Sequence, residues 1–274
     1  MAITILDGPI GTTLIAQGHP APAPAWSAAC LRSDPGAVSR LHADYARSGA
    51  TIHTANTFRT RRGSVGADWA VLADRAVTLA RSAVSEDHYI AGSMAPIADC
   101  YRPDLSPPNP GPLHAELAEV LKVSGVDILL CETFPHIGEG LAAAAAALDT
   151  GLKTWLSFTA GPEGMLLSPQ AVRAGAERAV KLGVSAVLIN CTCAQKTAPY
   201  VAALADLGVP FGAYANAGQA GQGLGWGSDV DGPERYADLA EEWVALGATL
   251  IGGCCGTDAR HIAALRSRFV GQTT

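Results

Sequence analysis

The chain has 274 residues, of which 49% are hydrophobic and 16% are charged, and its formal net charge is −6. This composition supports a large apolar core and excludes a disordered chain. The acidic balance and the lack of a Lys/Arg cluster argue against nucleic acid or an anionic membrane as the main partner. No apolar run reaches the roughly 18 residues of a membrane-spanning helix.

Short β-rich runs alternate with segments of helical periodicity along the sequence. Strands are expected at 4–7, 51–56, 89–94, 127–133, 154–159, 186–190, 211–216 and 249–253. Helices are expected at 36–48, 67–85, 113–124, 137–149, 169–182, 196–206, 232–246 and 258–268. The Pro-rich segments 19–25 and 103–112 are expected to be loops.

A glycine recurs between a helix and the next strand. The phrases are SGATIHT, SGVDILL, LGVSAVL, LGVPFGA and LGATLIG. A glycine just past a helix end explains the pattern, because it accepts the left-handed conformation that terminates many helices.

Eight β/α units in this length predict an α/β fold, a (β/α)₈ TIM barrel, which typically needs roughly 250 residues. We expect one domain over residues 1–274, since no internal linker is visible. A doubly wound sheet is the alternative, but no GxGxxG follows the first strand.

The cysteines give the clearest sign of function. There are seven, without the spacing of a disulfide framework, so we expect core, metal-binding or catalytic roles. The opening MAITILDGPIGTT has no basic segment before an apolar one, which predicts no secretory signal and a cytoplasmic location. We interpret Cys30, Cys100 and Cys131 as small buried hydrophobic residues.

Three of the cysteines are expected at one rim of the barrel. The active site of such a barrel lies at the C-terminal ends of its strands, where Cys191 and the pair Cys254-Cys255 are placed. Adjacent cysteines serve one site only if the backbone turns sharply, and the surrounding glycines permit this. Three thiolates predict a Zn²⁺ site with an open fourth position. Cys193 and His261 are the candidates for closing it.

The sequence as a whole resembles the zinc-dependent homocysteine S-methyltransferases. This family includes betaine– and S-methylmethionine–homocysteine methyltransferases and the homocysteine-binding module of methionine synthase. The matching pieces are LDGPIGTTL, WSAACL, HADYARSGATIHTANTF, GSMAP, GVDILLCETF, INCT, YANAG and GGCCGT. The INCT and GGCCGT motifs are the specific ones, and the resemblance implies the same barrel.

The resemblance implies that Cys191, Cys254 and Cys255 hold zinc and activate the homocysteine thiol. It also implies that Asp7 and Glu132 receive the substrate amino group. A turn or cap role for Asp7 and a buried salt bridge for Glu132 are the alternatives. Asn190 either orients the loop or contacts substrate, and Ser93 is a further substrate-binding candidate.

The methyl donor is expected to be a small onium compound, because the chain ends soon after the cysteine motif and leaves no room for folate or cobalamin modules. The WSA stretch resembles the group that uses S-methylmethionine or S-adenosylmethionine. Trp26 is a candidate for a cation–π contact with the donor, and Arg59 for binding a donor carboxylate. Both have packing or solvent-facing alternatives. Tyr214 either lines the pocket or lends its oxygen to the metal.

Several other functions stay open. The chain is alternatively a stand-alone homocysteine-binding module of a corrinoid-dependent methionine synthase, or a methyltransferase acting on another thiol or a selenol. A non-catalytic zinc or thiol-binding protein is a further alternative, as is a barrel lyase or aldolase with structural cysteines. The lack of a lysine at the predicted strand ends argues against a Schiff-base enzyme. The sequence carries no signal for oligomeric state.

Overall fold

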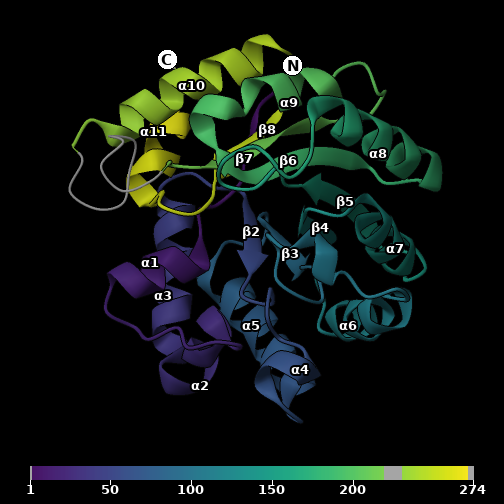
Figure 1. Cartoon of the computed structure of the whole chain (residues 1–274). Coiled ribbons are helices and arrows are strands. Elements are labelled where there is room, and N and C mark those ends of the chain that lie inside the picture. The colour runs from purple at the N-terminus through teal and green to yellow at the C-terminus, as the bar shows by residue number, and fades with distance from the viewer. Residues whose placement is uncertain (1, 219–229, 271–274) are drawn as a thin grey trace.

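Eight parallel strands form one sheet at the centre of the molecule, and helices surround it (Figure 1). The computed structural model describes residues 2–218 and 230–270. The strands are β1 (Thr4–Ile5), β2 (Ile52–Ala55), β3 (Tyr89–Met94), β4 (Ile128–Phe134), β5 (Lys153–Phe158), β6 (Ala186–Cys193), β7 (Phe211–Asn216) and β8 (Leu250–Gly253). Each predicted strand is present, which confirms the strand count.

The sheet closes on itself between its first two strands. The strands are ordered β1-β8-β7-β6-β5-β4-β3-β2, and a single parallel bridge between Leu6 and Ile52 joins the two edges. Two backbone hydrogen bonds support this seam, from Thr51 N to Ile5 O at 2.9 Å and from Asp7 N to Ile52 O at 3.0 Å. The predicted (β/α)₈ barrel is therefore confirmed.

All eight predicted helices are present. They are α3 (Pro35–Arg47), α5 (Trp69–Ala83), α6 (Gly111–Val123), α7 (Ile137–Leu148), α8 (Pro169–Leu182), α9 (Ala198–Leu204), α10 (Gly232–Ala245) and α11 (Ala259–Phe269). Three further α-helices were not predicted from the sequence: α1 (Ile10–Ala16), α2 (Cys30–Ser33) and α4 (Arg62–Val65). These segments are at most seven residues long, too short to show a helical period.

Local sequence signals set the helix ends. Asp34 and Ser168 accept hydrogen bonds from backbone amides in the first turns of α3 and α8, and Asp258 does so in α11. Asp231, before α10, makes no such bond. The five glycines between helices and strands all have positive φ, from +77° to +109°, as their place after a helix predicts. They are Gly49, Gly125, Gly183, Gly208 and Gly247.

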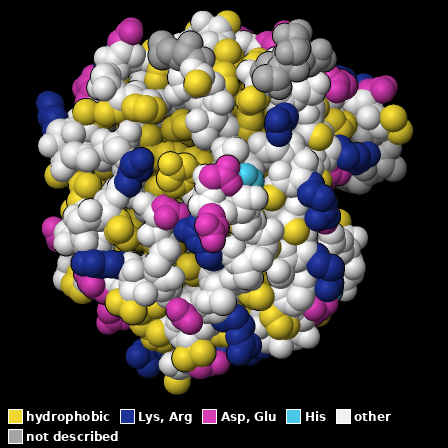
Figure 2. Space-filling model, turned by 180° about the vertical axis from the view of Figure 1, so that it is seen from behind, with side chains coloured by type: hydrophobic (Ala, Val, Ile, Leu, Met, Phe, Trp, Pro, Cys, Tyr) yellow, Lys and Arg dark blue, Asp and Glu magenta, His cyan; other side chains and the backbone are white. Residues whose placement is uncertain are grey.

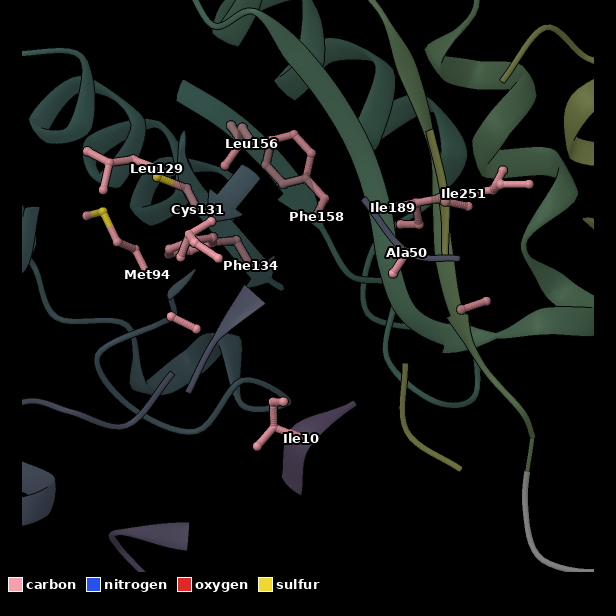
Figure 3. Close-up of a cluster of buried hydrophobic side chains, with 14 of the residues drawn as sticks. Ile10, Ala50, Met94, Leu129, Cys131, Phe134, Leu156, Phe158, Ile189 and Ile251 are labelled. Carbon is pink, nitrogen blue, oxygen red and sulfur yellow. The ribbon is translucent and has the colours of Figure 1, made fainter. Parts of the chain in front are cut away.

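Two layers of apolar side chains form the core, because alternate strand residues face opposite sides of the sheet. Inward-facing side chains such as Leu130, Leu188 and Leu250 fill the barrel. The outward layer packs under the helices, and Figure 3 shows Cys131, Phe134 and Phe158 within it. Cys30 and Cys131 are buried in this outer layer, as expected of small hydrophobic residues.

Charges of both signs are dispersed over the surface. Figure 2 shows carboxylates lying between the Lys and Arg side chains on one face of the molecule. Among the described residues, no helix combines the length and the apolar character needed to cross a membrane.

Candidate active site

The predicted site residues converge on one cavity of about 980 Å³. Its lining includes nine of the ten candidates from the sequence, all except Asn190. They are Asp7, Trp26, Arg59, Ser93, Glu132, Cys191, Tyr214, Cys254 and Cys255. They come from the ends of strands or the loops that follow them, which is where a (β/α)₈ barrel assembles an active site.

Three sulfur atoms form the first feature of this cavity. The Sγ atoms of Cys191, Cys254 and Cys255 all lie within 4.8 Å of one another. Zn–S bonds of about 2.3 Å in a tetrahedron separate the sulfurs by roughly 3.8 Å. The donor set and its spacing therefore fit a thiolate-bound metal with a position left for another ligand.

A tight turn aims both neighbouring cysteines at one point. Thr257 N donates to Cys254 O at 3.0 Å, and Gly256 within the turn has φ +82°. Gly253 is needed for a different reason, because a Cβ there would lie 2.2 Å from Thr257 Oγ1. Positive φ thus explains Gly256, and close packing explains Gly253.

Irregularities in two strands redirect the side chains at their ends. The register shifts between Cys131 and Phe134 in β4, and between Asn190 and Cys193 in β6. Thr133 and Cys191, inside these shifts, have φ of +63° and +51°. Left-handed backbone is unfavourable for a β-branched residue such as Thr133 and is typical of functional sites. β6 thus continues past the predicted end at residue 190 while still turning Cys191 toward the cavity.

The three thiols of the cluster differ in the direction of their pKa shifts. Contacts with Cys254 and Cys255, together with burial, raise the pKa of Cys191 well above its usual range. Contacts with Cys191 and Cys254 lower the pKa of Cys255 well below that range. For Cys254, the contact with Cys191 lowers the pKa, but Cys255 and burial outweigh it and raise the pKa. Three adjacent thiolates repel one another, so a divalent cation is the group that would favour loss of the other two protons.

Neither candidate for closing the cysteine cluster lies within it. The Cys193 thiol donates to Gln195 Oε1 at 2.6 Å and lines a separate, smaller cavity. His261 is fully buried in α11, where its Nδ1 lies 2.9 Å from the capping carboxylate of Asp258. The geometry therefore favours an open cluster of three cysteines.

Two buried carboxylates form the second feature of the cavity. Asp7 and Glu132 are 4% and 7% exposed. Burial raises the pKa of Asp7, and the charge of Glu132 adds to this, although the Thr54 amide opposes it. Burial likewise raises the pKa of Glu132 to about 7, against hydrogen bonds from Ser93 and Tyr214. Two close, desolvated acids are well suited to a cationic ligand.

Ser93 and Tyr214 orient the Glu132 carboxylate. Ser93 Oγ donates to Oε1, and Tyr214 Oη donates to Oε2 at 3.0 Å. Burial raises the pKa of Tyr214 well above its usual range, so it remains a phenol and a donor. Its hydroxyl thus contacts a carboxylate rather than the sulfur cluster.

Asn190 lies behind the cavity wall and links the ends of β4, β5 and β6. Its Oδ1 accepts from Thr133 N at 3.0 Å and from Ser157 Oγ at 2.7 Å, and its Nδ2 donates to Thr133 Oγ1 at 2.8 Å. These bonds hold the redirected ends of β4 and β6 together. Of its two sequence interpretations, this geometry favours orientation of the loop.

Replacing Asn190 with Ala is expected to destabilise the fold by about 2–4 kcal/mol, because it leaves a buried amide and a buried hydroxyl without partners. Urea denaturation measures this change. Ser157→Ala removes only one of the partners of Asn190 and should cost less than half as much. Equal losses in the two variants would contradict the linking role of Asn190.

A third part of the cavity lining is aromatic and cationic. Trp26 and Phe58 lie edge to face with ring centroids 5.8 Å apart. Gly11 makes room for the indole, since a Cβ there would lie 2.3 Å from it. Arg59 lies over the Phe58 ring at 5.0 Å and donates to Ala98 O at 2.9 Å. Arg59 therefore lies in the cavity wall, although backbone oxygen atoms already occupy part of its guanidinium.

Two further lining residues, Cys100 and Tyr101, were not assigned to the site from the sequence. Both lie in the loop after β3, just before the Pro-rich segment 103–112, and line the cavity. Burial raises the pKa of Cys100 to about 12. Burial and then the charges of Cys191 and Cys255 raise the pKa of Tyr101. The prediction that Cys100 is a core residue was wrong, because a loop position carries no periodic signal.

Comparison with known proteins identifies the family of the chain. Residues 4–269 match the model of a protein family described as homocysteine S-methyltransferase. The chain belongs to the homocysteine S-methyltransferase family. The resemblance inferred from the INCT and GGCCGT motifs is thereby confirmed, and the chain is an S-methyltransferase.

Individual relatives of this family align over nearly the full chain. Homocysteine S-methyltransferase of Escherichia coli is 31% identical, with 97% of this chain and 95% of the relative covered. Selenocysteine Se-methyltransferase of Brassica oleracea is 27% identical, with 97% and 88% covered. The crystal structure of the homocysteine methyltransferase MmuM from E. coli, in its metallated form, superposes with a TM-score of 0.82 at 28% identity, covering 98% of this chain and 96% of MmuM.

Proposed function

We propose that the protein transfers a methyl group from a small onium donor to the thiol of homocysteine and so forms methionine. S-methylmethionine or S-adenosylmethionine is the favoured donor. The observation that carries this proposal is the meeting of three thiols and two buried carboxylates in one cavity. A thiol amino acid presents a sulfur and an ammonium group, which are the complements of these two features.

Cys191, Cys254 and Cys255 are the proposed ligands of a zinc ion. Soft thiolate ligands favour zinc over harder divalent cations. Bound zinc would supply a Lewis acid that favours the thiolate form of the substrate thiol at neutral pH. The contribution of the chain is to hold the three sulfurs together by the turn after β8 and the redirected end of β6.

Asp7 and Glu132 are the residues proposed to bind the ammonium group of the substrate. Arrival of a positive charge favours the ionised form of both acids, opposing the effect of burial. Ser93 and Tyr214 fix the plane of the Glu132 carboxylate, so that the bound amino group sets the direction of the substrate sulfur. Positioning of this kind converts a bimolecular reaction into one between prearranged groups.

The remaining cavity suits a cationic donor. A volume of about 980 Å³ exceeds the needs of one small amino acid. The Trp26 and Phe58 rings offer faces to a sulfonium, and Arg59 offers hydrogen bonds to its carboxylate. The substrate sulfur then attacks the methyl carbon as the carbon–sulfonium bond breaks. The electron pair of that bond stays on the donor, which leaves as a neutral thioether.

A panel of donors tests this proposal. The protein is incubated with homocysteine and with S-methylmethionine, S-adenosylmethionine, betaine or dimethylsulfoniopropionate, each with and without a chelator, and methionine is measured. We expect methionine from a sulfonium amino acid and its loss with chelator. Methionine from none of the four would contradict direct transfer and favour a separate corrinoid protein as the donor.

A selenol acceptor is the second candidate. The cavity recognises an amino acid by its ammonium group and its chalcogen, and selenocysteine shares both. The Brassica relative is named for this substrate. Adding selenocysteine as an acceptor to the same panel, and comparing kcat/KM with that for homocysteine, distinguishes the two.

A further inference from the structure

A second cluster of possible metal ligands lies behind the cavity wall, apart from the cysteines. It combines Asp7, which follows β1, with His42 of α3 and His53 of β2. One ligand atom from each lies within 4.8 Å of the other two. All three side chains are buried, and the two imidazoles are completely inaccessible to solvent.

The imidazoles of this cluster have unused nitrogen atoms. Within the described part of the chain, neither ring nitrogen of His42 has a hydrogen-bond partner, and His53 Nδ1 has none either. Their rings meet edge to face at 6.3 Å. Buried polar atoms are almost always paired, and an unpaired one costs about 1–3 kcal/mol. Three such atoms beside a carboxylate indicate a site for a further group.

His88 orients His53 as a metal ligand would be oriented. His53 Nε2 lies 3.0 Å from His88 Nδ1. When Nε2 carries the proton and donates it to His88, the lone pair of His53 is on Nδ1, which has no hydrogen-bond partner among the described residues. Metal-binding histidines generally donate their other ring N–H to an acceptor such as a carboxylate or a carbonyl, and the His88 nitrogen would take that place here.

The charge states also suit a cation. Burial lowers the pKa of His42 to about 4, and burial with the neighbouring His42 and His88 lowers that of His53 to about 3. Both rings are therefore neutral at physiological pH, the form that binds metal. Asp7 Oδ2 accepts from Thr54 N at 2.8 Å, which leaves its other oxygen for the cluster.

We propose that Asp7, His42 and His53 form a second site for a divalent transition-metal ion. Two imidazoles and one carboxylate are a common ligand set for such ions. A cation here would engage the carboxylate that we assign to the substrate ammonium. The site is therefore inhibitory, filled by metal in excess of that held by the cysteines. Only this inhibitory effect depends on the proposed function.

Co²⁺ binding tests the site without any activity measurement. Equilibrium dialysis of the wild-type chain is expected to give two Co²⁺ per chain. His42→Phe, which keeps an aromatic ring, and His53→Leu should each bind one, with the thiolate-to-cobalt absorption retained. The double variant Cys254→Ala/Cys255→Ala should also bind one, without that absorption. His19→Ala, which removes a histidine outside the cluster, should still bind two.

The proposed second metal site would be contradicted if the wild-type chain bound only one Co²⁺ at saturation. It would also be contradicted if folded His42→Phe still bound two Co²⁺. Circular dichroism establishes folding, and His53→Leu provides the second variant if His42→Phe fails to fold. Excess Zn²⁺ should raise the KM for homocysteine at least tenfold in the wild type but not in His42→Phe. Two bound Co²⁺ without any methyl transfer would leave the site intact and overturn the proposed function instead.

Discussion

Replacement of Cys254 with Ala is expected to abolish both retention of a tightly bound metal and methyl transfer. Cys254 contributes one of only three sulfurs in the cluster, and two thiolates hold a zinc ion far more weakly than three. Loss of a Lewis acid that supplies several kcal/mol corresponds to a fall in kcat/KM on the order of a thousandfold or more. Metal analysis after dialysis and a methionine assay measure the two effects.

Cys193→Ala is the matched control for this prediction. Cys193 is two residues from Cys191 on the same strand, but its thiol bonds to Gln195 away from the cluster. This variant should keep its metal and most of its activity. A Cys254→Ala protein that retains full activity with no bound metal would show that the cysteine cluster is not the centre of the reaction.

Glu132→Gln is expected to lower kcat/KM for homocysteine by roughly ten- to a hundredfold, mainly through KM. The substitution replaces a charged hydrogen bond to the ammonium, worth about 1.5–3 kcal/mol, with a neutral one. In the wild type, kcat/KM should fall as the pH drops below about 7, where Glu132 gains a proton. This limb of the pH profile should be smaller in Glu132→Gln, where Asp7, whose pKa burial also raises, is the one remaining carboxylate assigned to the ammonium.

The same substitution is expected to stabilise the fold above pH 7. Burial raises the pKa of Glu132 from 4.5 to about 7, so the folded chain binds this proton more tightly than the unfolded chain. The stability contributed by this proton is complete below about pH 4.5 and is lost as the pH rises to about 7, a change of about 3 kcal/mol. Glutamine is neutral throughout and avoids this loss.

Urea denaturation at pH 5 and pH 8 measures the effect. The difference in unfolding free energy between Glu132→Gln and the wild type should be larger at pH 8. Glu116→Gln is the control, because Glu116 is an exposed carboxylate that lines the same cavity. A stabilisation that is independent of pH would contradict the assigned pKa of Glu132.

The regular part of the fold could be predicted from the sequence because its signals are local. The strands alternate with helices of ordinary length, and a glycine such as Gly183 terminates a helix by its own conformational freedom. The carboxyl ends of parallel strands meet at one rim, so Cys191 and Cys254 could be placed together from more than sixty residues apart.

The irregular part could not be predicted, because its causes are long-range. The register shift at Cys191 depends on pairing with β7 and on the hydrogen bonds of Asn190 to β4 and β5. The sequence around Tyr101 shows neither periodicity nor a motif, so only the folded chain brings it to the cavity. The cluster of Asp7 with His42 and His53 likewise combines a strand end, a helix and a neighbouring strand.

The seam between β1 and β2 gives Asp7 a role in the architecture of the barrel. The backbone hydrogen bonds between β1 and β2 end with the one from Asp7 N to Ile52 O. Two residues further along β2, Thr54 N donates to the Asp7 carboxylate at 2.8 Å instead. The Asp7 side chain, to which we assign substrate binding, thus also completes the closure of the sheet. Amide hydrogen–deuterium exchange at Thr54 should therefore report ligand binding. Any group that binds the Asp7 carboxylate also changes its hydrogen bond with Thr54 N, which is the last hydrogen bond between β1 and β2.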